Sequence, residues 1–556
     1  MSGKHLLFLF MLVFFLSVNA AQAANIDVMD RQRQQAPEPK SLPPVRISED
    51  AATPGQDQSV RFTLGSLSVE GATVFTEAEL LAPYRGKFGS SISFNDLNGI
   101  AAEMTKKYRD AGYLLSRVLL PAQDADPLMA QIRLIAVEGY IASVEYSGDT
   151  GFVSRFKDYF SSVEQKLLGK KPLKHKDFER EMLLLQDLAG VKISSHFKEA
   201  PVPGGSILVL EVERDLLDGS VGWGNTGTDS SGPSIYSASL GISTLPIGAR
   251  TSVSYSQAED IQEYYSIQVG QSYQFSNGLL ASFSYAFSES QKPDSQFARF
   301  FDYETRSDTF SLGLSYPLIR SRDMNLSLGA SYDHRNSYAD LLDARYTSDR
   351  LRSLTVNANF DFADEWGGLT QIIPSVTQGL NIANATNKHT GSASPLAGAQ
   401  YIRGNLYLSR NQQLFSNASL FVSGSGQISD SHQASYNRFM LGGSQFGRGY
   451  DPGVIEHDNG AAFSIEPRWT FYPTEKSAIQ PFAFYDGGTV WASREIEGIK
   501  DQEHLSSAGL GIRFWGHLGD ERLPDFNFSF FVGKPLEKVR NERTHERFVF
   551  QVALLF

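Results

Sequence analysis

The clearest candidates for an ion pair in the sequence are one arginine and two carboxylates in the C-terminal half. Arg448 lies beside Gly449 in the glycine-rich segment LGGSQFGRGY, which ends at Tyr450. Downstream, Asp486 is followed by two glycines, and Glu466 lies between this acid and the arginine. Because arginine stays charged and binds carboxylates bidentately, we expect Arg448 to pair first with Asp486 and second with Glu466. A solvated surface loop with a chance Arg-Gly-Tyr tripeptide is the alternative interpretation.

Catalytic and metal-ligating residues give no comparable signal. The chain has no cysteine, which excludes thiolate metal sites, disulfides and a cysteine nucleophile. Its 10 histidines are scattered, and His334, His389 and His432 fall in expected loops without metal-ligand spacing. The sequence contains no G-x-S-x-G, H-E-x-x-H or phosphate-loop motif. We therefore expect no catalytic residue, no metal and no cofactor, and we do not interpret the protein as an enzyme.

Composition favours a large β structure. The 556 residues carry a formal net charge of −12, and such an acidic chain is a poor candidate for binding nucleic acid. Charged residues make up only 20% and aromatic residues 12%, with 48 glycines. These values argue against disorder and against a long-helix protein.

Through residues 215–556, the sequence predicts one strand after another in which apolar and small polar residues alternate. Phe283 and Tyr285 alternate with Ser282 and Ser284, so that one strand face is apolar and the other polar. A soluble sandwich of this size would be an unusually large domain, whereas a membrane barrel presents apolar faces to lipid and polar faces to its lumen. The pattern predicts a mainly β protein with about 16 antiparallel transmembrane strands. A long loop at about residues 430–458 would then bring the arginine into the lumen.

The C-terminus repeats this alternation to its last residue. Phe548, Phe550 and Phe556 lie on one face of the final strand. An ordinary half-buried strand would show the same pattern. A terminal aromatic residue on an amphipathic strand, however, resembles the assembly signal of outer-membrane barrels.

Two small α/β modules are expected before the barrel, at residues 61–138 and 139–214. In the first, the pattern predicts a β-α-α-β-β order: a strand at Phe62–Val69, a helix near Glu77–Ala82, a helix capped by Ser93, and strands at Leu114–Leu120 and Gln131–Val137. The scheme restarts with a strand near Ile141 and closes with a strand at Ile207–Val212. From the residues alone, generic scaffolding and capture of extended chains at a sheet edge are equally good interpretations.

The N-terminus has the pattern of an export signal. Lys4 precedes an apolar run, and Ala21 and Ala23 frame a cleavage site, so residues 1–23 are expected to be a signal peptide that is removed. A membrane anchor is the alternative, but the apolar run is short for a span. Residues 24–60 are expected to form a Pro-rich linker with a short helix at Ile26–Gln35.

A family resemblance joins these features. The segments YRDAGY at residues 108–113, SRV at 116–118 and Glu138-Gly139 resemble a polypeptide-transport-associated (POTRA) domain. The Arg-Gly-Tyr loop with its downstream aspartate resembles the lumen loop of the outer-membrane insertase and two-partner secretion superfamily. Signal peptide, linker, two POTRA domains and barrel together resemble the two-partner (type V) secretion transporters of the haemolysin and filamentous-haemagglutinin type.

This resemblance implies a function and its partners. The POTRA domains would capture a large, unfolded exoprotein in the periplasm, and the barrel would conduct it across the outer membrane. The implied partners are that exoprotein, outer-membrane lipids and the barrel-assembly machinery, with no nucleic acid. An insertase for other outer-membrane proteins is the alternative function, and a passive porin is disfavoured by the POTRA pair. Members of this family often have an N-terminal helix that plugs the pore. The expected plug helix at Ile26–Gln35 is short, which departs from that pattern.

Overall fold

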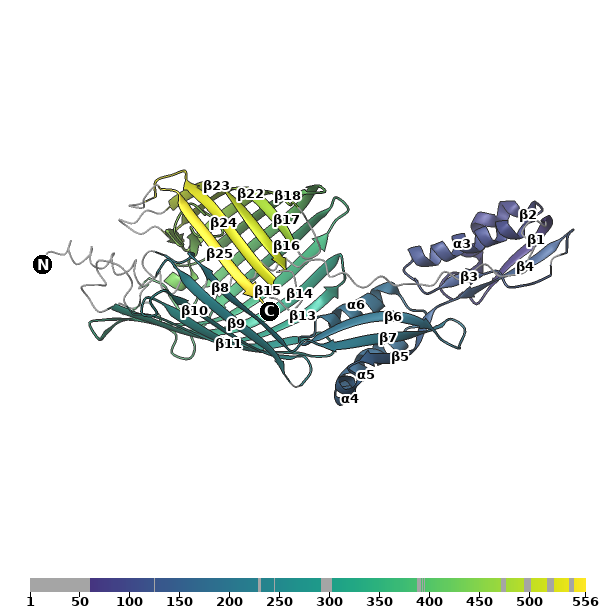
Figure 1. Cartoon of the computed structure of the whole chain (residues 1–556), viewed down its shortest axis with the longest axis horizontal. Helices are drawn as coiled ribbons and strands as arrows, with labels where there is room; N and C mark the ends of the chain where they lie inside the picture. Colours follow the sequence, from purple (N-terminus) through teal and green to yellow (C-terminus); the bar gives the residue numbers. More distant parts are fainter. Residues whose placement is uncertain are drawn as a thin grey trace. The chain divides into compact units, whose positions relative to one another are not determined.

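The computed structural model describes residues 61–124, 126–228, 232–244, 246–291, 303–387, 392, 394, 396–471, 477–494, 502–517, 525–539 and 545–556. The expected signal peptide, linker and plug helix precede residue 61 and lie outside these residues, as does His389. The chain divides into two compact units, one holding the N-terminal modules and the other the barrel strands (Figure 1).

The first module is a four-stranded sheet in the order β2-β1-β4-β3, with β1 and β4 parallel. Its elements are β1 (Arg61–Glu70), α2 (Glu77–Leu81), a 3-10 turn (Ala82–Lys87), β2 (Ser91–Ser93), α3 (Phe94–Asp110), β3 (Arg117–Leu119) and β4 (Ala130–Val137). Ser93 and Asp96 form a reciprocal capping box at the start of α3. The apolar face of this helix, including Leu97 and Met104, packs in one core with Leu64 and other sheet residues. The expected order omitted β2, because a three-residue strand is too short to show a period.

The second module is a three-stranded sheet in the order β5-β7-β6 with three helices. Its elements are β5 (Tyr140–Gly148), α4 (Thr150–Arg155), α5 (Lys157–Leu168), α6 (His175–Gln186), β6 (Val191–Glu199) and β7 (Gly205–Arg214). It therefore does not simply repeat the first module, since it has an extra helix and the unpredicted strand β6. Beyond Ile193 this strand is largely half-buried or exposed, so its apolar alternation is weak.

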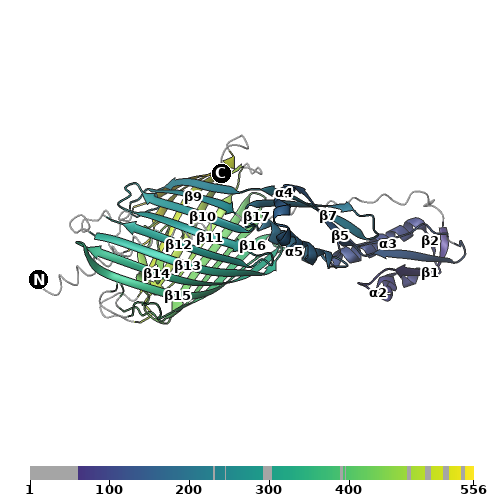
Figure 2. The ribbon, with the colours of Figure 1, turned by 90° about the horizontal axis from the view of Figure 1, so that it is seen from below.

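Sixteen antiparallel strands close into a barrel, which confirms the predicted fold class. The strands are β8 (Leu217–Gly224), β9 (Ile235–Thr244), β10 (Ala249–Ala258), β11 (Tyr265–Gln274), β12 (Leu280–Ser290), β13 (Tyr303–Arg320), β14 (Met324–Leu341), β15 (Ala344–Ala363), β16 (Gly368–Gly379), β17 (Ile402–Phe415), β18 (Ala418–Ser429), β21 (Asn459–Trp469), β22 (Ser477–Trp491), β23 (Gln502–His517), β24 (Asp525–Pro535) and β25 (Arg547–Leu555). Each strand pairs with its neighbour in the sequence, and β25 pairs with β8 to close the ring. Figure 2 shows the strands from β9 onward side by side and inclined together.

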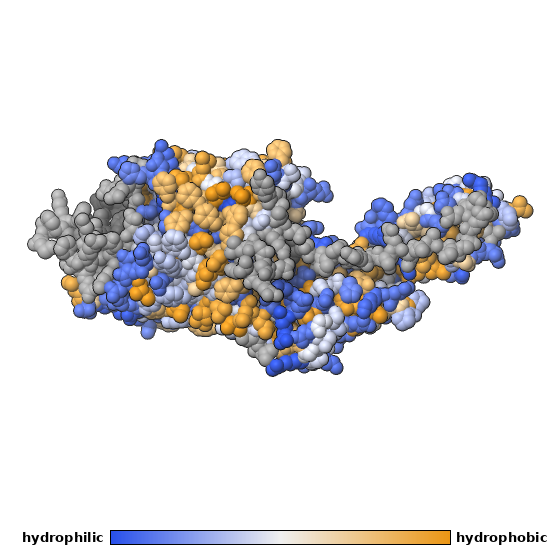
Figure 3. All heavy atoms as spheres, viewed as in Figure 1, coloured by the Kyte–Doolittle hydropathy of each residue, from blue (hydrophilic) through white to orange (hydrophobic). Residues whose placement is uncertain are grey.

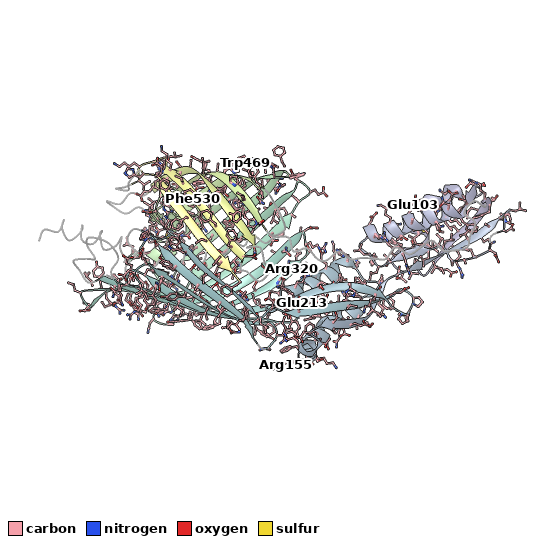
Figure 4. All side chains as sticks on the ribbon, viewed as in Figure 1. Glu103, Arg155, Glu213, Arg320, Trp469 and Phe530 are labelled. Carbon is pink, nitrogen blue, oxygen red and sulfur yellow. The ribbon has the colours of Figure 1, made fainter. Side chains whose placement is uncertain are left out.

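The two faces of the barrel wall differ in polarity. In β21, Phe463 and Ile465 are exposed on the outer face, while Ser464 and Glu466 are buried on the inner face. Apolar side chains gather over the outside of the barrel in Figure 3, as a lipid-facing wall requires. Figure 4 labels Phe530 on this wall; it alternates in β24 with the buried Phe531.

The helices of the described residues are short or polar relative to a bilayer. Within the described residues, none is both long and apolar enough to cross a membrane.

Candidate functional site

The loop between β18 and β21, residues 430–458, folds as a hairpin packed against the inner wall. Its short strands β19 (Phe439–Leu441) and β20 (Ile455–His457) pair with each other. Leu441 and Ile455 are fully buried in a cluster that also contains Val490 of β22 and Leu505 of β23. The lumen wall is therefore not uniformly polar, because it offers the loop an apolar surface on one side.

The loop brings Arg448 onto both predicted carboxylates. The guanidinium donates from Nε to Asp486 Oδ2 at 2.9 Å and from Nη2 to Asp486 Oδ1 at 2.8 Å, a bidentate arrangement. Nη1 donates to Glu466 Oε2, and Nη2 also donates to Ser464 Oγ at 2.9 Å. The Arg448 main-chain N–H adds a third bond to Asp486, at 3.1 Å. Arg448 is 5% exposed and Asp486 0%, so this is a buried pair and not a solvated loop.

Glu466 is shared by two further arginines. Arg468 of β21 donates from Nε to Glu466 Oε1 at 2.7 Å, and Arg513 of β23 donates from Nη1 to the same oxygen at 2.7 Å. Glu466 and Arg468 share one strand face, a signal visible in the sequence. Arg513 was missed, because no local pattern relates it to β21.

Each of the three guanidinium groups also lies over a phenylalanine ring. Arg448 Cζ lies 3.7 Å from the ring centre of Phe484, Arg513 lies 3.9 Å from that of Phe482, and Arg468 lies 4.1 Å from that of Phe421. Such cation–π contacts are strongest where water is excluded. The site is thus a packed alternation of arginine, carboxylate and aromatic ring.

Glycines make the close approach of loop and wall possible. A Cβ on Gly533 of β24 would lie 2.7 Å from the carbonyl oxygen of Arg448. A Cβ on Gly509 of β23 would lie 2.3 Å from the ring of Phe484. Larger residues at these positions would displace the loop main chain or the ring beneath the guanidinium.

Tyr450 fastens the tip of the loop a second time. Its hydroxyl donates to the Glu537 carbonyl oxygen at 2.8 Å and accepts from the Glu537 main-chain N–H at 3.1 Å. Gly449 packs against the main chain of Lys534. All three residues of the Arg-Gly-Tyr motif therefore contact the region around β24.

Two histidines lie in settings other than solvated loops. His334 lies inside β14 and not in a loop, which corrects the expectation. His432 lies in the lumen loop, and its Nδ1 is 2.8 Å from the buried Asp458. Across the described residues, no group of three or more His, Cys, Asp or Glu side chains could hold a metal ion.

Phe548 and Phe550 lie in β25, the strand that closes the barrel, and Phe556 directly follows it. Phe548 and Phe556 are exposed, and the Phe550 ring packs edge-on against Trp223 of β8, with centroids 4.7 Å apart. Phe556 exchanges two main-chain hydrogen bonds with Gly219, of 2.8 and 3.0 Å. The intervening Val549 points inward to pack with Phe482 and Phe484. The outward aromatic row and the closing seam therefore belong to the same strand.

A carboxylate also organises the first module. Glu138 accepts hydrogen bonds from the main-chain N–H groups of Thr73 and Val74, at 2.7 and 2.8 Å, and from the Tyr108 hydroxyl at 2.9 Å. Burial works to raise the pKa of Glu138, but the hydrogen bond from the Thr73 hydroxyl, together with the main-chain and Tyr108 bonds, outweighs it and holds the pKa below its ordinary value. Burial and the bond to Glu138 together raise the pKa of Tyr108.

Comparisons with known proteins agree with this architecture. The family model described as haemolysin secretion/activation protein ShlB/FhaC/HecB matches residues 204–514, and a POTRA domain model of the ShlB type matches residues 62–139. The outer membrane transporter CdiB of Escherichia coli is 24% identical over 535 residues, 93% of this chain and 86% of its own length. The heme/hemopexin transporter protein HuxB of Haemophilus influenzae is 22% identical, over 94% of this chain and 92% of its own. A solved structure of CdiB from Escherichia coli superposes with a TM-score of 0.73 at 22% identity, covering 96% of this chain and 98% of that one.

Proposed function

The chain belongs to the haemolysin secretion/activation family described as ShlB/FhaC/HecB, and on that premise we propose how it moves its partner. It is an outer-membrane two-partner secretion transporter of a partner exoprotein, with its POTRA region in the periplasm.

We propose that the exoprotein is captured unfolded in the periplasm by pairing with an edge strand of the POTRA region. The edges of the second module's sheet are β5 and β6, each nine residues long. Main-chain pairing of this kind makes few demands on side chains, which suits a chain that has not yet folded. The first module offers shorter edges, because β2 and β3 have three residues each.

The lumen loop sets the conducting state of the barrel in this proposal. The observation that carries it is the buried bidentate contact between Arg448 and Asp486. With the pair formed, the loop occupies one side of the lumen, and its movement away from the wall would make room for the exoprotein. A buried ion pair is held firmly while both partners are present, and separating them is costly.

We propose roles for three further features of the chain and its surroundings. Residues 1–23 direct export of the chain across the inner membrane. The final strand, with Phe548, Phe550 and Phe556, is the signal for the barrel-assembly machinery. Outer-membrane lipids surround the apolar outer face of the barrel.

The test is a comparison of culture supernatants from cells with and without this gene. We expect one large protein to vanish from the medium when the gene is deleted, whether it then accumulates in the periplasm or is degraded there. Matching supernatants together with lower amounts of several outer-membrane barrels would contradict the transporter function. That result would support an insertase instead.

A further inference from the structure

The surroundings of Arg448 form a complete receptor for a guanidinium group. Asp486 accepts from two of its nitrogens, Glu466 accepts from a third, and Ser464 accepts from Nη2 at 2.9 Å. The ring of Phe484 lies beneath the guanidinium plane. A planar cation with several fixed donors matches this site, whereas a lysine ammonium would satisfy only part of it.

All of these receptor groups belong to the barrel wall. Ser464 and Glu466 lie in β21, and Phe484 and Asp486 lie in β22. Only the guanidinium comes from the loop. If the loop moves away, as the proposed function requires, the receptor remains in place and opens to the lumen.

The two carboxylates respond differently to loss of the loop. Glu466 keeps Arg468 and Arg513 as partners, each at 2.7 Å. Asp486, among the residues that the structure describes, accepts hydrogen bonds from Arg448 alone. Movement of the loop therefore leaves one carboxylate without a cation, beside an aromatic ring on the lumen wall. A carboxylate in that setting favours a replacement cation.

We propose that the vacated receptor binds arginine side chains of the exoprotein as it passes through the barrel. This inference rests on the proposed function, because it requires the loop to leave its site during transport. Val490 and Leu505, which Leu441 and Ile455 cover in the present arrangement, would provide apolar contact to residues flanking the bound arginine. An arginine of the exoprotein thus competes with Arg448 and keeps the loop from closing until the chain has passed.

The test uses the purified full chain in lipid nanodiscs and three small probes. In Arg448→Ala the receptor is vacant, and we expect saturable binding of N-acetyl-arginine amide, followed by saturation-transfer NMR. Its neutral isostere, N-acetyl-citrulline amide, should bind at least about tenfold more weakly, because the charge-assisted bonds are lost. N-acetyl-lysine amide should fall between them. The wild-type chain, whose receptor is filled, and the variant Arg448→Ala/Asp486→Asn should bind the arginine probe no better than the citrulline probe.

Several results would overturn the receptor. These are equal binding of the arginine and citrulline probes by Arg448→Ala, and unchanged arginine binding after Asp486→Asn is added. Heat modifiability on gels establishes that each variant is a folded barrel; if Arg448→Ala fails this check, Arg448→Gln takes its place. Failure of the proposed function appears separately, as an unchanged supernatant after gene deletion, so the two failures cannot be confused.

Discussion

Two carboxylates in this chain each fasten a loop, and they do so with different donors. In the first POTRA module, Glu138 accepts from neutral groups, namely the main-chain N–H groups of Thr73 and Val74 and the hydroxyls of Thr73 and Tyr108. In the barrel, Asp486 accepts from the charged side chain and the main chain of Arg448. Breaking the first contact exposes polar groups to water, whereas breaking the second separates two buried charges.

The difference suggests different uses for the two contacts. Hydrogen bonds from neutral donors within one folded module are expected to remain formed, because their role is structural. A buried pair of opposite charges between loop and wall gives the loop one firmly held position, because separating the two charges is costly.

The largest effect is expected from removing one member of the barrel pair. Arg448→Ala or Asp486→Ala should lower secretion at least about tenfold, because leaving a buried charge without its partner costs about 3–5 kcal/mol. The barrel itself should remain inserted. Exoprotein in the medium and heat-modifiable barrel in the membrane fraction provide the two measurements.

The double variant Arg448→Ala/Asp486→Ala serves as the control for this pair. It should lose less than the sum of the two single effects, because neither charge is left alone. Normal secretion by both single variants would rule out the loop as a lock.

Substituting Glu466 should lower the stability of the barrel wall more than it disturbs the lumen loop. Glu466→Gln leaves Arg448, Arg468 and Arg513 converging on a neutral group, so we expect the barrel to lose about 3 kcal/mol of stability through repulsion and unpaired charge. The gel temperature at which the barrel unfolds should fall more for this variant than for Asp486→Asn. An equal fall in unfolding temperature for both variants would show that the two additional arginines at Glu466 do not make this acid more important for stability than Asp486.

Substituting Glu138 should change the pH dependence of the first module's stability and leave the barrel unaffected. Because the folded-state pKa of Glu138 lies below its ordinary value of 4.5, its stabilising contribution is complete above that pH and is lost as the pH falls through the lowered pKa. Glu138→Gln should remove this dependence and cost about 1 kcal/mol at neutral pH.

Hydrogen exchange at the amides of Thr73 and Val74, corrected for the intrinsic effect of pH, measures this contribution in the full chain. Identical pH profiles for wild type and Glu138→Gln would exclude Glu138 as their origin.

The smallest effect is expected from the ring beneath the guanidinium. Phe484→Leu keeps an apolar side chain but removes the cation–π contact to Arg448, worth about 0.5–2 kcal/mol. Secretion should fall by a few-fold at most. Tyr485→Leu is the matched control, since this neighbour faces outward and is exposed, and secretion by it should be unchanged. A larger loss in Tyr485→Leu than in Phe484→Leu would contradict the assigned role of the ring.

Much of the architecture follows from local patterns in the sequence. Alternation over residues 215–556 predicts the barrel, because each strand must separate lipid from lumen. The types and spacing of Arg448, Asp486 and Glu466 single out the three charges that the structure brings together. Their role as a lock is still a prediction.

Other features depend on contacts that no local pattern encodes. Arg513 reaches Glu466 only because β23 lies beside β22, with Arg513 opposite Gln480 in the register. Strand β6 was missed, because its side chains are mostly half-buried or exposed and carry little periodicity. The apolar cluster around Leu441 was missed as well, since the loop was expected to meet a polar lumen.

A reversible disulfide staple between the loop and the wall tests whether the loop must leave the wall for transport. A Cβ on Gly460 of β21 would lie 2.0 Å from Phe439 Cδ1, so Phe439→Cys/Gly460→Cys removes the ring and places two thiols within bonding reach. The chain has no cysteine of its own, so no other thiol competes. Each single-cysteine variant is a control for the substitutions themselves.

The measurement is exoprotein secretion by the stapled barrel before and after addition of a reductant. If the loop must leave the wall for transport, the oxidised variant blocks secretion, and reduction restores it to the level of the single-cysteine controls. Equal secretion by the oxidised and reduced forms would contradict the account, because the exoprotein would then pass with the loop still fastened.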